Sequence, residues 1–190
     1  DAKRTHTDIR QADWLYSQDR WEVRAGVSKI FWGVIESNHL VDIINQTDTV
    51  EDLDGEDKLG QPMVQFAWFS DYGNVRFFYL PIFRERTFPG VNGRLRPPQP
   101  IERDLTRYTN SAEEFNPDIA IRYEHTIGNW DIGIAHFSGT SREPGFIPVI
   151  NSDNALVFAP LYETIDQTSL DLQLTTESWL WKWESFYRQG

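Results

Sequence analysis

The sequence predicts an all-β protein, an antiparallel up-and-down meander of about eight strands that forms part of a transmembrane β-barrel. Apolar and polar residues alternate with a period of two along several segments, which is typical of strands with one apolar and one polar face. Aromatic residues make up 14% of a chain whose net charge is −11. Short turns alternate with long connections, as periplasmic turns alternate with extracellular loops in outer-membrane barrels.

Each strand is predicted from its own stretch of alternation. Between 118 and 126, for example, Ile119 and Ile121 alternate with Asp118 and Arg122. Lys29 falls on the apolar side of the second strand, so it is expected near one rim of the barrel or beside a β-bulge. In chain order, the predicted strands are residues 8–17, 20–35, 62–71, 74–84, 118–126, 130–139, 166–175 and 179–189.

The connections between these strands differ strongly in length. The short ones are residues 17–20, 70–74, 126–130 and 175–178, and all but the last contain Gly, Asn or Asp, which supply the backbone conformations that hairpin turns require. The long ones are expected to be loops, and loops beyond ~12–15 residues are usually functional; they are residues 36–61, 85–117 and 140–165.

A soluble β-sandwich alternates in the same way, and an aromatic-rich carbohydrate-binding module of that kind is the alternative hypothesis. Trp179, Trp181 and Trp183 lie on one side of the last strand, where they form either a sugar-stacking platform or a lipid-facing surface. The barrel is favoured because Lys182 and Glu184 put both signs of charge on the polar side. The bulky apolar side is also a poor fit to an interior in which two sheets interdigitate.

The two sides of the strands give two sets of candidate residues. The polar side is expected to face the lumen, where it forms a charged pore wall, an internal network of ion pairs, or both. These residues are Glu22, Arg24, Arg76, Arg122, Glu124, Asp171, Lys182 and Glu184. The apolar side is expected to face lipid, and its residues are Trp21, Phe66, Trp68, Phe77, Tyr79, Ile121, Tyr123, Trp179, Trp181 and Trp183.

Two loop segments carry charges in patterns that suggest ligands. Arg84, Arg86, Arg94 and Arg96 are expected either to bind an anionic solute at the mouth, because guanidinium groups match carboxylate and phosphate, or to form a solvated loop. The acidic run 51–57 lacks the EF-hand pattern, because Val50 and Gln61 occupy positions that need acids. It is either a looser calcium site or a solvated acidic loop.

Other classes of protein are disfavoured. The net charge of −11 argues against a nucleic-acid partner. The chain has no cysteine and no uninterrupted apolar run long enough for a membrane-spanning helix. Hydrolase and metalloprotease motifs are missing, and His39, His125 and His136 are scattered. No enzymatic activity, catalytic residue, metal or cofactor is therefore expected.

Two short motifs are distinctive, Trp-Gly-x-x-Glu at 32–36 and Asn-Gln-Thr-Asp at 45–48. With these motifs, much of the chain from residue 20 onward resembles uncharacterised Gram-negative outer-membrane barrels of the porin and alginate-export type. The resemblance extends over 21–26, 31–37, 40–48, 58–63, 83–90, 130–133 and 141–144. It implies a barrel located in the bacterial outer membrane, with membrane lipid as a partner. The small polar or anionic solute expected as the second partner is inferred from the charged lumen and the loop arginines.

The topology also leads to an expectation about completeness. Both ends of the chain would lie on the side opposite the short turns, whereas bacterial barrels have an even strand number and normally place both ends on the turn side. Residues 1–190 are therefore expected to be a single domain that is an internal segment of a larger barrel. Its first and last strands are expected not to pair with each other.

Overall fold

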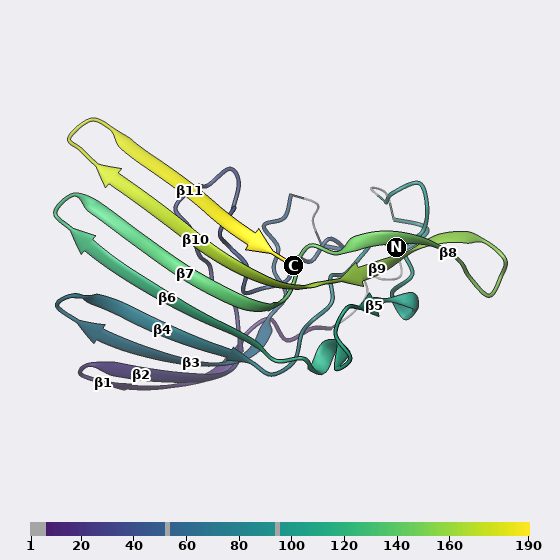
Figure 1. Cartoon of the computed structure of the whole chain (residues 1–190), viewed down its shortest axis with the longest axis horizontal. Helices are drawn as coiled ribbons and strands as arrows, with labels where there is room; N and C mark the ends of the chain where they lie inside the picture. Colours follow the sequence, from purple (N-terminus) through teal and green to yellow (C-terminus); the bar gives the residue numbers. More distant parts are fainter. Residues whose placement is uncertain (1–6, 52–53, 94–95) are drawn as a thin grey trace.

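The computed structural model describes residues 7–51, 54–93 and 96–190, which form two β-sheets (Figure 1). The large sheet has the strand order β1-β2-β3-β4-β6-β7-β10-β11, and all neighbouring strands are antiparallel. Its strands are β1 (Ala12–Gln18), β2 (Trp21–Ser28), β3 (Gln61–Ser70), β4 (Gly73–Leu80), β6 (Asp118–Ile127), β7 (Trp130–Thr140), β10 (Thr164–Thr175) and β11 (Leu180–Gln189).

The small sheet lies beyond the ends of the long strands (Figure 1). It has the order β5-β9-β8, with β5 parallel to β9. Its strands are β5 (Arg107–Tyr108), β8 (Gly145–Ile150) and β9 (Leu156–Tyr162), and two 3-10 turns, η2 (Arg103–Leu105) and η3 (Glu113–Phe115), flank β5. These elements occupy connections that were predicted to be loops. Pro148 and Pro160 interrupt the alternation that marks a strand in sequence.

The predicted all-β class and the antiparallel eight-stranded meander are confirmed, since each predicted segment overlaps one strand of the large sheet. Within the described residues no ladder joins β1 to β11, which form the two edges.

The predicted extent of the second strand is wrong, because β2 ends at Ser28 and not at residue 35. The backbone N–H of Ile30 donates to Asn45 Oδ1 (2.8 Å), and the chain leaves the sheet there. Lys29 therefore lies just past the strand and needs no bulge.

All four tight turns lie at one end of the large sheet, which we call the turn end (Figure 1). The long connections and the small sheet lie at the opposite end, the loop end. Within the part of the chain that the structure describes, no helix is long and apolar enough to cross a membrane.

The core lies between one face of the large sheet and the connection from β2 to β3. We call that face the inner face, and we call residues 29–51 and 54–60 the inner segment. Trp32, Val41, Ile43 and Ile44 of the inner segment are buried against apolar residues of the sheet, which are Met63, Phe78, Leu80, Ala120, Ala135, Phe137 and Ile165. The opposite, outer face is exposed.

Candidate functional site

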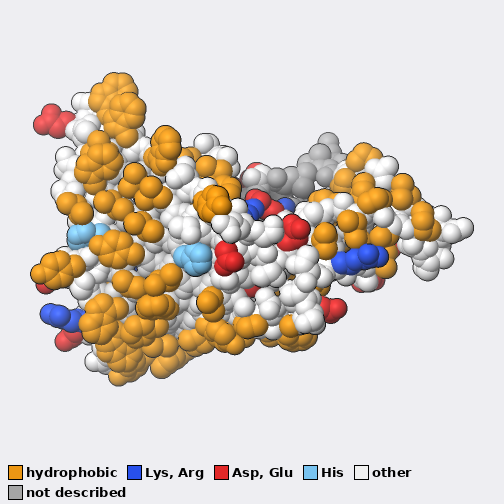
Figure 2. All heavy atoms as spheres, in the orientation of Figure 1, with side chains coloured by type: hydrophobic (Ala, Val, Ile, Leu, Met, Phe, Trp, Pro, Cys, Tyr) orange, Lys and Arg blue, Asp and Glu red, His pale blue; other side chains and the backbone are white. Residues whose placement is uncertain are grey.

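The outer face of the large sheet carries an extensive exposed apolar surface (Figure 2). Among the residues predicted to face lipid, Trp21 and Tyr123 are half-buried and the rest are exposed. Trp181 and Trp183 keep 63% and 62% of their surface exposed, values far above those of core residues. Trp179 lies in the last tight turn, where its ring stacks on Trp181 at 6.1 Å between centroids.

The border of this apolar surface runs obliquely across the strands. One row of paired residues begins with Phe66 and Phe77 and continues through Ile121, all apolar. The same row continues into His136 and Thr168 on β7 and β10, which are polar. On β7 and β10 the apolar surface is displaced toward the turn end, and the row itself ends at the exposed Tyr187 on β11. Toward the turn end, the outer face of these three strands carries Ile132, Ile134, Leu170, Leu172, Leu174, Trp181 and Trp183.

Three polar side chains meet at this border. His136 Nδ1 lies 2.9 Å from Thr168 Oγ1, and its Nε2 lies 3.9 Å from an oxygen of Asp166. The sequence alone indicates no partner for His136. Its neighbours Asp166 and Thr168 lie about thirty positions later, and only the register of β7 against β10 brings them together. The only sequence signal is the spacing of Asp166 and Thr168, which places both on one side of a strand.

All the residues predicted on the polar side of the strands lie on the inner face, where several form an ion-pair network. Arg122 donates from both terminal nitrogens to Asp171, at 2.8 and 2.9 Å. Its Nε donates to Glu124 (2.8 Å), which also pairs with Arg76. The network therefore extends from β4 through β6 to β10.

A glycine between the partners makes the central pair of this network possible. Gly133 on β7 lies opposite Glu124 on one side and Asp171 on the other. A Cβ at this position would collide with Arg122 Nη2 and with both carboxylate oxygens of Asp171. Arg122 reaches across β7 to Asp171 because this position has no side chain.

The inner segment covers this network. The ring of Trp32 lies 5.4 Å from the Arg122 guanidinium carbon and 5.4 Å from the Phe78 ring. Arg122, Asp171 and Glu184 are buried as a result. Glu22, Arg24, Arg76, Glu124 and Lys182 are half-buried, and Arg24 pairs with Asp13 at 3.1 Å. The inner face thus holds an ion-pair network beneath a covering segment.

Glu184 fixes the inner segment to the last strand. Its Oε1 accepts hydrogen bonds from the backbone N–H groups of Val34 (2.6 Å) and Ile35 (2.9 Å). Its Oε2 accepts from those of Leu40 (3.0 Å) and Val41 (3.4 Å). Two residues earlier on β11, Lys182 pairs with Glu36. Lys182 and Glu184 were both predicted to be lumen-facing charges. The hydrogen bonds of Glu184 to the backbone of the inner segment could not be predicted from the alternation of apolar and polar residues.

A second buried pair, at the loop end, was missed by sequence reasoning because one partner lies in a connection. Arg142 Nη1 donates to Asp118 Oδ2 (2.7 Å), and Nε and Nη2 donate to the carbonyl of Ile44 at 3.1 and 2.9 Å. The guanidinium carbon lies 5.1 Å from the rings of both Phe83 and Phe137. This pair attaches the inner segment to β6.

Two aspartates of the inner segment have pKa values displaced in opposite directions. Burial raises the pKa of Asp42, and the ammonium group of Lys58, 3.3 Å away, offsets only part of the effect. Burial acts in the same direction on Asp48, but hydrogen bonds from Thr87 and Arg10 outweigh it and hold the pKa of Asp48 below its ordinary value. Asp48 is therefore a buried, ionised group.

Most of the loop arginines predicted to bind an anion are bonded within the protein. Arg84 donates to the carbonyl of Gly60 (2.6 Å) and to Asp8 (2.9 Å). Arg86 donates to Gln46 (3.2 Å) and to the carbonyl of Arg142 (2.9 Å). Arg96 is exposed and donates to the carbonyls of Pro97 and Pro98, both at 3.2 Å. Arg94 lies outside the described residues, as do positions 52–53 of the acidic run.

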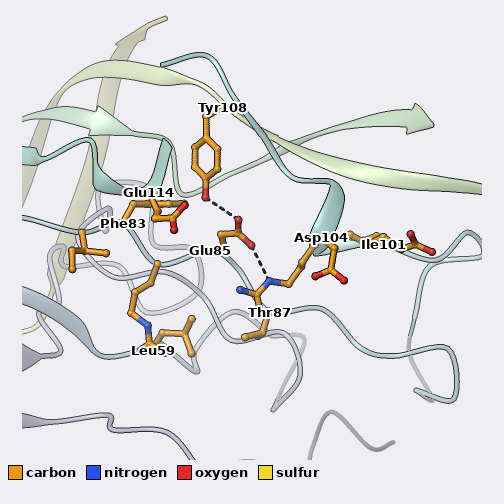
Figure 3. Close-up of a pocket in the computed structure, with 12 residues that line it drawn as sticks. Leu59, Phe83, Glu85, Thr87, Ile101, Asp104, Tyr108 and Glu114 are labelled. Carbon is orange, nitrogen blue, oxygen red and sulfur yellow. Dashed lines mark hydrogen bonds and ion pairs between the residues drawn. The ribbon is translucent and has the colours of Figure 1, made fainter. Parts of the chain in front are cut away.

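A pocket of about 800 Å³ lies at the loop end (Figure 3). Its residues come from the chain between β4 and β6, which includes η2, β5 and η3, and from Leu59 of the inner segment. Glu85 accepts from Arg103 Nε (2.9 Å) and from the hydroxyl of Tyr108 (2.8 Å). No group of three or more His, Cys, Asp or Glu side chains within the described ranges is arranged to hold a metal ion.

Comparison with known proteins gives no match: no family model, no curated protein and no solved structure matches the chain. The resemblance of its sequence to Gram-negative outer-membrane barrels therefore stays an expectation.

Proposed function

We propose that this chain is part of a bacterial outer-membrane β-barrel that acts as a porin-like channel for small polar solutes. The observation that carries the proposal is the exposed apolar surface of the outer face, with its oblique border. In a barrel the strands tilt relative to the axis and their register is staggered. A membrane is perpendicular to that axis, so its edges cross the rows of paired residues obliquely.

The aromatic residues at the turn end support a membrane position. Trp21, Trp68, Tyr72, Trp130 and Trp179 all lie in or next to the tight turns. Outer-membrane barrels carry girdles of aromatic side chains where the apolar band meets the headgroups. The strands β3, β6, β7, β10 and β11 have 10 to 12 residues, and about 9–11 tilted residues span a bilayer.

The inner face supports a polar interior. Most of its charges form ion pairs within the protein, as buried charges require, and the interior of an outer-membrane barrel is polar. The arginines expected to attract an anion are bonded to internal acceptors or lie outside the described residues. We therefore propose a small polar solute and include no preference for anions.

A soluble carbohydrate-binding module is the rival function, favoured by the stacked rings of Trp179 and Trp181. Small-molecule sites combine apolar walls with a few polar groups that fix the orientation of the ligand. On β10, the residues opposite Trp183 and Trp181 are Leu172 and Leu174. Their side chains offer a sugar no hydrogen bond. The surroundings of the tryptophans therefore favour lipid.

The proposal is tested with the full-length protein, by fractionation and by tryptophan fluorescence. We expect the protein to partition with outer membranes and to migrate differently on gels with and without heating. After reconstitution, lipids brominated on their acyl chains should quench its tryptophans, and soluble oligosaccharides should not. Recovery in the detergent-free soluble fraction, together with quenching by a sugar ligand alone, would favour the module and overturn the proposal.

A further inference from the structure

The loop-end pocket is a hollow lined by charged side chains that the proposed channel has not accounted for. Its charged residues are Arg84, Glu85, Glu102, Arg103, Asp104 and Glu114. Leu59 and Phe83 form an apolar part of the lining, and the Phe83 and Tyr108 rings meet edge to face at 6.2 Å. In the proposed barrel the loop end is the extracellular mouth, so a solute meets this pocket before it reaches the inner segment.

Both arginines of the pocket are paired with carboxylates. Arg84 pairs with Asp8 at 2.9 Å, and Arg103 pairs with Glu85 at 2.9 Å. Figure 3 shows Glu85 between Tyr108 and the arginine side chain to which it is joined. Because each guanidinium already faces a carboxylate, the positive charges of the pocket are neutralised locally.

Three carboxylates of the pocket are left without a cationic partner among the described residues. Glu102 accepts a hydrogen bond from the neutral amide of Asn151 (2.8 Å). Asp104 and Glu114 have no ion-pair partner within the same residues, and Figure 3 shows them on opposite sides of Glu85. The pocket is therefore net negative as well as partly apolar.

The phenol of Tyr108 is consistent with this negative potential. Burial raises the pKa of Tyr108, and its hydrogen bond to Glu85 and the charges of Glu85 and Glu114 raise it further. The hydroxyl therefore stays protonated at neutral pH and donates to Glu85. It adds a hydrogen-bonding group to the wall and no charge.

We propose that this pocket is a cation-attracting vestibule, which makes the channel prefer inorganic cations and small solutes with an ammonium group over anions. The inference rests on the proposed function, because a vestibule selects only what then passes through a pore. Rings of Asp and Glu are a common basis of cation selectivity. A recess whose net charge has one sign concentrates ions of the opposite sign, within a screening length of ~10 Å at 0.1 M.

The experiment measures the reversal potential of the full-length protein in planar bilayers across a tenfold gradient of KCl. We expect potassium to be more permeant than chloride, and the preference to weaken as salt is raised. The double variant Asp104→Asn/Glu114→Gln should lower the potassium-to-chloride permeability ratio at least twofold. The matched control is Asp71→Asn, which removes a carboxylate from the tight turn between β3 and β4 at the opposite end and should leave the ratio unchanged.

The outcomes separate this inference from the proposed function. A pore that prefers chloride, or one whose preference does not change in the double variant, overturns the inference and leaves the channel in place. Membrane-inserted protein without any conductance overturns the proposed channel, and the inference with it. Retention of the far-ultraviolet spectrum and of heat-modifiable migration by the double variant shows that a lost preference is not a loss of fold.

Discussion

At the scale of single residues, small side chains on the inner face decide which charged groups can meet. Gly133 lies beneath the contact between Arg122 and Asp171, and Gly139 lies in the same way beneath the carboxylate of Asp118. Both glycines are on β7, next to the strand β6 that supplies Arg122 and Asp118. Because both charged groups extend over β7, to Asp171 on β10 and to Arg142 after the end of β7, the size of the inward residues of β7 limits the ion pairs that can form.

We predict that Gly133→Ala destabilises the protein by about 1–3 kcal/mol, the usual cost of forcing extra volume into a packed site. The added methyl group displaces Arg122 from Asp171, and both are buried. Denaturant-induced unfolding measures the change. Gly145→Ala is the matched control, since a Cβ there approaches nothing closer than 3.9 Å; equal effects of the two substitutions would contradict the prediction.

A second prediction concerns the pH dependence of stability. The pKa of Asp48 lies below its ordinary value of 3.8 in the folded protein, so the group stabilises the fold above about pH 3.8. This contribution is lost as the pH falls through the folded-state pKa. Asp48→Asn should cost about 1.5–3 kcal/mol at pH 7, the range for hydrogen bonds to charged groups, and should flatten the fall in stability below pH 3.8.

Unfolding curves collected from pH 2 to pH 7 test this expectation. Asp166→Asn serves as the control, because the Asp166 side chain is 62% exposed and should contribute little. An Asp48→Asn protein that loses stability with acid as steeply as the unaltered chain would show that Asp48 does not carry the effect.

At the scale of elements, the sequence predicts the strands of the large sheet because each has one buried and one exposed face. The alternation in β3 or β6 directly reflects that burial. The inner segment has no such period, since it is held by partners far away in sequence. The backbone N–H groups of Val34 and Ile35, for instance, donate to Glu184 about 150 positions later. Local pattern therefore predicts the sheet and not what covers it.

We predict that Glu184→Gln loosens the inner segment without unfolding the sheet. The amide has one oxygen in place of two, and its NH₂ group faces backbone donors. Hydrogen exchange of the amides of Val34, Ile35, Leu40 and Val41 should accelerate by roughly 10- to 100-fold, which corresponds to ~1.5–3 kcal/mol. Glu177→Gln, in the exposed last turn, should leave these rates unchanged; uniform acceleration through the whole sheet would oppose a local role.

At the scale of the whole molecule, the outer face divides into an apolar surface and a polar border that only the three-dimensional register reveals. The sequence predicts which residues share each face, because the strand period is two. It does not predict that Ile121 and Thr168 lie in one row of the sheet and on opposite sides of the border. The loop-end pocket was equally beyond local pattern, since it joins three separate connections.

These two positions provide a test of membrane depth. In the proposed barrel, Ile121→Lys places a charge within the apolar band and should cost about 2–4 kcal/mol of stability in lipid vesicles, whereas Thr168→Lys lies near the interface and should cost about 0–1 kcal/mol. Unfolding from vesicles and from detergent measures both. Equal costs at the two positions would contradict an oblique membrane border.

The contact of Glu184 with the inner segment has a consequence for the order of folding. Sequential strands are neighbours in the large sheet, so it can grow hairpin by hairpin from β1. The inner segment follows β2, yet its anchor is on β11, between 143 and 150 positions later in the chain. Contacts between such distant residues form slowly, because a long loop must first close. We therefore expect the charged face to be open to water while the strands assemble, and the closing of the inner segment over it to be the last event of folding.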